Sequence, residues 1–298
     1  MPSYQPQNIR LGLLFMVASV FWFALLDTTV KWLTQGYATT QIVWFRYTIS
    51  LLIGLAYAWP GRGLRLFNTG RPWLQVSRGA LLLACSITAV IALRYLPLVD
   101  VMAVIFSTPL MTCALSVPLL REKVGWRRWT AICIGFCGVL IILRPGFNEV
   151  HWAVLAALAS AFFGAIYNIV TRLVSATDSP NTQLLYANLV GSVLITPAVP
   201  FVWETPSGWD WGLFLLIGLF AALGHLCLIH AFTKGPASIL TPFSYTQLLW
   251  TTLLSYVVFA QVPSPWTFVG AAVLVACGIY LLHRERVVAR GIVAAAQR

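Results

Sequence analysis

The sequence predicts an all-α membrane protein: ten transmembrane helices in an inverted five-plus-five repeat around a central cavity, with both termini in the cytoplasm. The composition, the length of the apolar runs and a weak internal repeat predict this class. Of the 298 residues, 59% are hydrophobic and 9% are charged, whereas a soluble domain carries about 25% charged residues. So few charges cannot cover a water-facing surface, which argues against a soluble enzyme or a nucleic-acid-binding protein.

Ten apolar runs are long enough to cross a bilayer. A helix needs about 20 apolar residues to span the hydrocarbon core, and lipid leaves unpaired backbone groups without partners, which favours helices. The runs are 9–33, 40–59, 74–95, 99–120, 127–143, 151–174, 181–203, 210–232, 237–260 and 265–283. The first run is longer than the apolar core of a signal peptide, so we expect it to remain as a span.

The basic residues predict the orientation. The chain has 19 Lys and Arg against 8 Asp and Glu, a net charge of +11. If the N-terminus is cytoplasmic, most of these residues, Arg71 and Arg78 among them, fall on the cytoplasmic side, as the positive-inside rule requires. An even number of spans then returns the C-terminus to the same side.

The two halves resemble each other along the sequence. Trp126 and Gly138 match Trp266 and Gly278 at an offset of 140 residues. Five spans in each half would bring the second copy into the membrane from the opposite side, and inverted repeats suit alternating access to a site near the midplane. We therefore divide the chain into a first five-helix repeat, residues 1–145, and a second, inverted one, residues 146–298.

Metal and cofactor chemistry has no support in the sequence. His225 and His230 are five residues apart in one run, so they would lie on different faces of a helix. That is a poor zinc pair, and the six cysteines fall inside apolar runs. No nucleotide-binding P-loop occurs, which excludes ATP as the direct source of energy. We expect no metal, no cofactor and no catalytic residues.

Two charged residues inside the spans are candidates for ligand binding. Asp27 could bind a proton or a substrate ammonium group; alternatively, it pairs with Lys31 one turn later or with Arg46. Arg46 could bind a substrate carboxylate with its planar fork, neutralise Asp27, or extend toward the interface. The sequence leaves these alternatives open.

The ninth run is rich in polar and aromatic side chains, and Pro242 interrupts its hydrogen bonding. Tyr245 and Gln247 could bind polar groups and Trp250 could stack on a ring, although residues two apart on a helix point in different directions. Asn168 and Asn188 could line the cavity or serve only in polar packing. The residues predicted to line the cavity are Asp27, Arg46, Tyr47, Tyr95, Ser107, Tyr167, Asn168, Asn188, His225, Ser244, Tyr245, Gln247 and Trp250.

One segment in each half carries a family resemblance. The first half holds Pro109, Glu122, Gly135 and Gly138 in PLMTCALSVPLLREKVGWRRWTAICIGFCGVLIIL, and the second half holds PFSYTQLLWTTLLSYVVFAQVPSPWTFVGAAVLVACGIYLL. This pattern resembles the ten-helix EamA-type exporters of the drug/metabolite transporter superfamily. One departure is Gln261, where that family commonly has an acidic residue.

The resemblance implies a secondary transporter of the bacterial inner membrane that exports amino acids, with a preference for aromatic or neutral ones, or related metabolites. The alternative is a permease for nucleosides, vitamins or sulfonium metabolites, and a membrane-embedded enzyme is a remote third. The expected partners are a small-molecule substrate and the lipid bilayer, without nucleic acid. Small residues in the fifth and tenth runs predict close helix packing, in a monomer or a weak homodimer.

Overall fold

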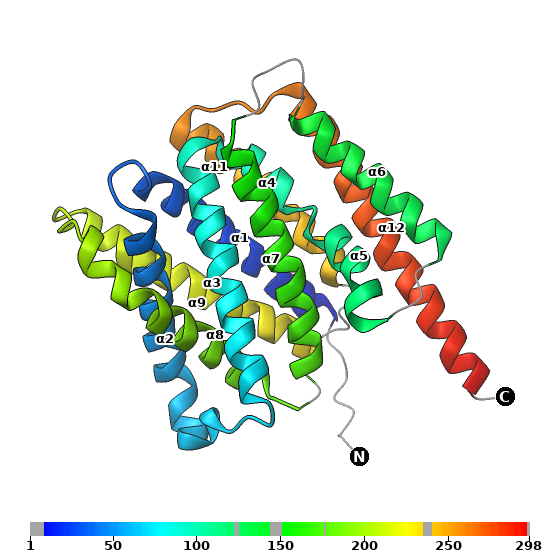
Figure 1. Cartoon of the computed structure of the whole chain (residues 1–298), viewed down its shortest axis with the longest axis horizontal. Coiled ribbons are helices and arrows are strands. Elements are labelled where there is room, and N and C mark those ends of the chain that lie inside the picture. Colours follow the sequence, from blue (N-terminus) through cyan, green and yellow to red (C-terminus); the bar gives the residue numbers. More distant parts are fainter. Residues whose placement is uncertain (1–8, 122–124, 144–150, 176, 235–239, 297–298) are drawn as a thin grey trace.

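The computed structural model describes residues 9–121, 125–143, 151–175, 177–234 and 240–296, and all regular structure in these ranges is helical (Figure 1). Eight helical segments are long and apolar enough to cross a membrane, and Pro265–Leu281 is a shorter apolar helix. The all-helical membrane prediction is therefore confirmed. The predicted number of ten spans remains a prediction.

Most helices follow the predicted runs, but the last helix continues to Ala296, past the predicted end of the tenth run at 283, and the first residues of the ninth run, 237–239, lie outside the described part of the chain. The first half contains α1 (Ile9–Leu33), α2 (Thr39–Arg62), the 3-10 helix η1 (Gly63–Phe67), α3 (Pro72–Tyr95), α4 (Leu98–Ile105), α5 (Thr108–Leu120) and α6 (Trp126–Leu143). The second half contains α7 (Ala153–Val174), α8 (Pro180–Ile195), η2 (Thr196–Val202), α9 (Asp210–Lys234), η3 (Thr241–Thr246), α11 (Gln247–Phe259) and α12 (Pro265–Ala296).

Proline divides two of the predicted runs. The fourth run is continuous in sequence but forms α4 and α5, which part near Ser107, and Pro109 lies in the first turn of α5. Proline has no N–H and therefore cannot continue the backbone ladder of an α-helix. In the ninth run, Pro242 likewise falls in the first turn of η3, ahead of α11. Both breaks lie inside apolar segments, where irregular backbone is tolerated only if protein or a cavity surrounds it.

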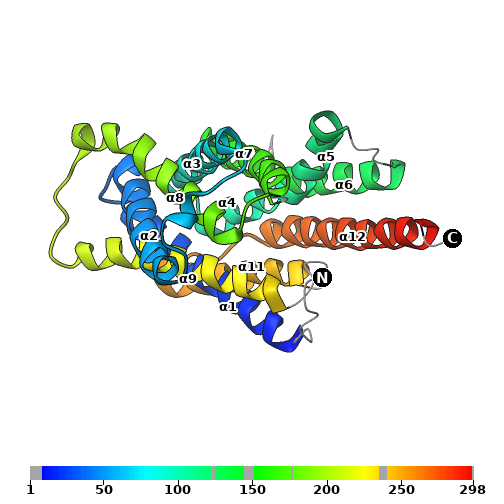
Figure 2. The same ribbon diagram turned by 90° about the horizontal axis from the view of Figure 1, so that it is seen from below.

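The helices pack in matched pairs. The largest contacts join α1 to α9 and α3 to α7; α2 also packs on α9 and α3 on α8, while α1 meets α11 and α5 meets α7. Figure 2 shows α1, α9 and α11 on one side of the molecule and α3, α7 and α8 on the other. At one edge α6 lies along α12, where a Cβ added to Gly270 would come within 2.5 Å of the Gly138 carbonyl oxygen. This close approach confirms the predicted role of small residues in packing these two helices.

Candidate functional site

Arg46 on α2 lies near polar side chains of three other helices, α1, α3 and α9. Its Nη1 donates to Ser86 Oγ on α3 at 3.4 Å, and its guanidinium lies 5.7 Å from the centre of the Tyr47 ring. Asp27 on α1 and His225 on α9 lie within electrostatic range of it. The side chains of Arg46, Asp27 and His225 each keep part of their surface exposed, and they come from three different helices, α2, α1 and α9.

Asp27 is held by the ninth run and not by its neighbour in sequence. Gln247 Nε2 on α11 donates to Asp27 Oδ2 at 3.0 Å. Lys31 Nζ instead donates to the carbonyl oxygens of Leu93, at 2.5 Å, and Leu96, at 2.8 Å. The alternative in which Asp27 pairs with Lys31 is therefore wrong, because the ammonium group caps the C-terminal end of α3.

His225 has a defined tautomer when it is neutral. Its Nδ1 lies 2.8 Å from the carbonyl oxygen of Ala221, and a carbonyl can only accept, so Nδ1 carries the proton. The neutral ring then offers the Nε2 lone pair as an acceptor. Phe23 packs edge-on against the ring, with the ring centres 5.0 Å apart.

Aromatic pairs connect α1 to its neighbours beside these polar groups. Trp22 stacks on Phe220 of α9 at 5.6 Å between ring centres with an angle of 25°. Phe21 meets Trp250 of α11 edge-on at 5.0 Å. All four rings are partly exposed, and such surfaces can stack on a flat ligand.

Several other predicted cavity residues lie in the interior with defined partners. The hydroxyl of Tyr47 lies 2.8 Å from Ser86 Oγ, and the hydroxyl of Tyr167 accepts from Arg78 Nη1 at 3.0 Å. Ser107 Oγ is buried at the α4–α5 break and has no hydrogen-bond partner within the described part of the chain. Ser244 is half-buried in η3.

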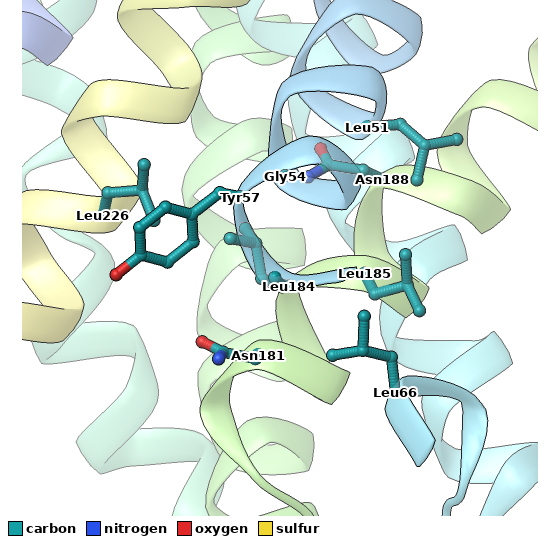
Figure 3. A pocket seen from close by; sticks show the side chains of 10 residues that line it. Leu51, Gly54, Tyr57, Leu66, Asn181, Leu184, Leu185, Asn188 and Leu226 are labelled. Carbon is teal, nitrogen blue, oxygen red and sulfur yellow. The ribbon is translucent and has the colours of Figure 1, made fainter. Parts of the chain in front are cut away.

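Asn188 is buried beside a small cavity between α2, α8 and α9 (Figure 3). Gly54, Tyr57 and Leu226 line the same space. Its volume is about 10 Å³, roughly the room that one water needs, so it is too small for a metabolite. Asn188 therefore packs in the interior and does not face a substrate-sized space here.

Three predicted residues lie away from Arg46. Tyr95 is 50% exposed at the end of α3 and stacks on His151 at 5.5 Å between ring centres. Asn168 is exposed on α7. Tyr245 is buried against α12, where a Cβ on Gly278 would clash with its hydroxyl. Tyr245 and Gln247 thus have different neighbours, as their two-residue spacing predicts.

A buried polar network that the sequence analysis missed joins α3 to the segment between α7 and α8. Arg78, placed above on the cytoplasmic side, is 2% exposed. Its guanidinium donates to Gln75 Oε1 at 3.3 Å, to the Tyr167 hydroxyl and to the carbonyl oxygen of Gln183. Asp178 accepts from Gln75 Nε2 at 2.7 Å. The position of Arg78 inside an apolar run, three residues after Gln75, is the signal that could have revealed it.

Asp178 lies outside the spans and accepts further hydrogen bonds from Thr69 Oγ1 and from the Gly70 amide at 3.1 Å. Burial would raise the pKa of Asp178, but these hydrogen bonds and the one from Gln75 outweigh burial and lower that pKa below its usual value. A carboxylate whose pKa falls on folding stabilises the folded state above its ordinary pKa, and this contribution is lost as the pH falls through the folded-state pKa.

We predict that Asp178→Asn lowers the unfolding free energy at pH 7.5 by roughly 1–3 kcal/mol, because an amide cannot accept at both of its terminal atoms. The thermal unfolding midpoint of the purified protein in detergent measures this. The difference in unfolding free energy between the variant and the wild type should narrow between pH 7.5 and a pH below the lowered folded-state pKa of Asp178, where the carboxyl group is protonated in both states. The exposed Glu204→Gln is the matched control, and an equal gap at both pH values would contradict the charged role of Asp178.

Comparison with known proteins identifies the family. A model described as the EamA-like transporter family matches residues 10–144 and 151–284. An S-adenosylmethionine uptake transporter of Rickettsia felis is 26% identical, with 87% of this chain and 88% of the relative covered. A riboflavin transporter of Vibrio cholerae is 29% identical, with 92% and 93% covered. A pseudopaline exporter of Pseudomonas aeruginosa is 26% identical, with 93% and 98% covered.

A solved structure, described only as the crystal structure of a protein, has the same fold. It superimposes with a TM-score of 0.66 at 19% identity and covers 93% of this chain and 98% of its own. The family match extends over most of the sequence, and the relatives above are all named as transporters. The chain belongs to the EamA-like transporter family.

Proposed function

We propose that the chain is a secondary permease for a small metabolite of the vitamin or sulfonium-nucleoside class. The names of its relatives support this alternative better than the amino-acid export that the sequence led us to expect, because they specify S-adenosylmethionine and riboflavin. Both compounds combine a flat heterocycle with polar groups. The relatives include an uptake transporter and an exporter, so the substrate gradient would set the direction.

The observation that carries the proposal is the composition of the interior between α1, α2, α9 and α11. It combines a carboxylate, Asp27, and a guanidinium, Arg46, with partly exposed aromatic pairs such as Trp22 and Phe220. Charged groups inside a membrane protein are costly and usually serve a ligand or ion path. Rings stack on a heterocycle while the charges bind its polar substituents.

Alternating access of two inverted repeats, residues 1–145 and 146–298, is the mechanism that we propose. The matched helix pairs support it: exchanging the two halves turns the α1–α9 contact into α7–α3, and the α1–α11 contact into α7–α5. Equivalent contacts allow the halves to exchange roles around a site at their interface. We place the protein in the bacterial inner membrane with both termini in the cytoplasm, and we assign it no catalytic step.

Uptake by purified protein in liposomes tests the proposal. Radiolabelled S-adenosylmethionine, riboflavin and phenylalanine would be offered separately, with protein-free liposomes as the blank. We expect saturable flux of S-adenosylmethionine or riboflavin and none of phenylalanine. Saturable flux of phenylalanine alone would restore the amino-acid interpretation, and no flux of any of the three would contradict the proposed class.

A further inference from the structure

We infer that Asp27 and Arg46 form a two-pole subsite that selects a substrate carrying both a cationic and an anionic group over an uncharged one. The inference rests on the proposed function and narrows it to the sulfonium amino-acid class represented by S-adenosylmethionine. That compound carries a sulfonium and an ammonium cation together with a carboxylate, whereas riboflavin is uncharged at neutral pH.

The two charges form hydrogen bonds with neutral partners and not with each other. Asp27 Oδ2 accepts from Gln247, while Arg46 donates to Ser86 across a long 3.4 Å contact. A direct ion pair would offset part of the cost of placing both charges within the membrane span. Keeping them apart leaves opposite poles that the two ends of a zwitterion can bridge.

Both groups retain unused hydrogen-bonding capacity. An arginine has five N–H donors, and within the described chain Arg46 uses one of them in a hydrogen bond. Asp27 Oδ1 has no hydrogen-bond partner in the same described ranges. The remaining N–H groups suit a substrate carboxylate, and the remaining carboxylate oxygen suits a substrate cation.

Arg78 differs from Arg46 in its burial and in its number of hydrogen-bond acceptors. Arg78 is 2% exposed and donates to three protein acceptors, as a structural arginine does. Arg46 is partly exposed and donates to one. If Arg46 served only to stabilise the fold, it should have a set of partners like that of Arg78.

An aromatic ring lies on the same face of α1 as Asp27. Phe23 lies one turn before Asp27 on the same face of α1, and its ring packs against His225. Neutral His225 offers the Nε2 acceptor derived above, which an exocyclic amine on a heterocycle could reach. The charged and titratable groups facing Arg46 from the neighbouring helices are Asp27 on α1, Cys85 on α3 and His225 on α9. Asp27 is the only anion that Arg46 meets among these groups.

The test compares three probes in proteoliposomes: S-adenosylmethionine, uncharged adenosine and riboflavin. The wild type should carry S-adenosylmethionine at least tenfold more efficiently, as flux at concentrations below KM, than either uncharged probe. Asp27→Asn should reduce that flux at least tenfold, while any flux of the uncharged probes stays within about twofold. Asp27→Glu should restore part of the loss, and Glu204→Gln on the exposed surface is the matched control.

The outcomes separate the two claims. A wild type that carries none of the three probes refutes the proposed function. A wild type that prefers riboflavin, with flux unchanged in Asp27→Asn, refutes the two-pole subsite alone. The two-pole subsite is also refuted if Asp27→Asn reduces the flux of every probe equally while the unfolding midpoint stays at the wild-type value. Asp27 would then serve transport of any substrate and would not determine selectivity.

Discussion

Replacing Arg46 with glutamine should lower the transport of S-adenosylmethionine by roughly one to two orders of magnitude. The proposed guanidinium–carboxylate contact is a charge-assisted hydrogen bond, and such bonds contribute about 1.5–3 kcal/mol, where 1.4 kcal/mol is a factor of ten. The loss should appear mainly in KM if Arg46 binds the substrate in its ground state. Initial uptake rates over a range of substrate concentrations in proteoliposomes measure both parameters.

A substrate analogue separates binding from folding in this experiment. Decarboxylated S-adenosylmethionine keeps the ring and the cations but lacks the group that Arg46 would bind. Its flux should be weak in the wild type and almost unchanged in Arg46→Gln. Arg94→Gln is the matched control, because Arg94 is exposed at the end of α3. If Arg46→Gln reduced the flux of both compounds equally, the assignment of the carboxylate to Arg46 would be wrong.

The spans and the charged candidates could be predicted because both depend on local sequence. Twenty consecutive apolar residues define a span whatever surrounds it. Asp27 is the only acidic residue in the run 9–33, and Arg46 is the only charged residue in the run 40–59. The sequence could not choose between the partners open to Asp27. Lys31 is available on the same helix, but it reaches the end of α3, and this contact depends on how α1 and α3 pack.

The positions of the aromatic candidates were harder to predict, because the packing of other helices determines which face of a helix is buried. Tyr95 is the last residue of the predicted run 74–95 and of α3, and its ring meets His151. Tyr245 does line a cavity, of about 410 Å³, but this cavity lies between α11 and α12, where α12 passes close to the tyrosine ring at Gly278. Neither contact leaves a local signal in the sequence, since each joins segments more than 30 residues apart.

The burial of Arg78 also depends on contacts that the sequence did not reveal. Replacing Arg78 should have the largest effect on stability. Arg78→Met should lower the unfolding free energy by roughly 3–5 kcal/mol, the range for removing one partner from a buried charged network. The apolar side chain would leave Gln75 Oε1, the Tyr167 hydroxyl and the Gln183 carbonyl oxygen without their common donor. A marked fall in the thermal unfolding midpoint in detergent is the expected readout.

Two further variants make the Arg78 result specific. Arg78→Lys should be intermediate, because an ammonium group keeps the charge but cannot reach three acceptors with a planar fork. Arg71→Met should have little effect, since Arg71 is exposed and its side chain makes one long contact, 3.4 Å, to the Leu173 carbonyl oxygen. If Arg78→Met unfolded at the wild-type temperature, the network would not tie α3 to α7 and α8. The contrast between a structural Arg78 and a substrate-binding Arg46 would then lose its basis.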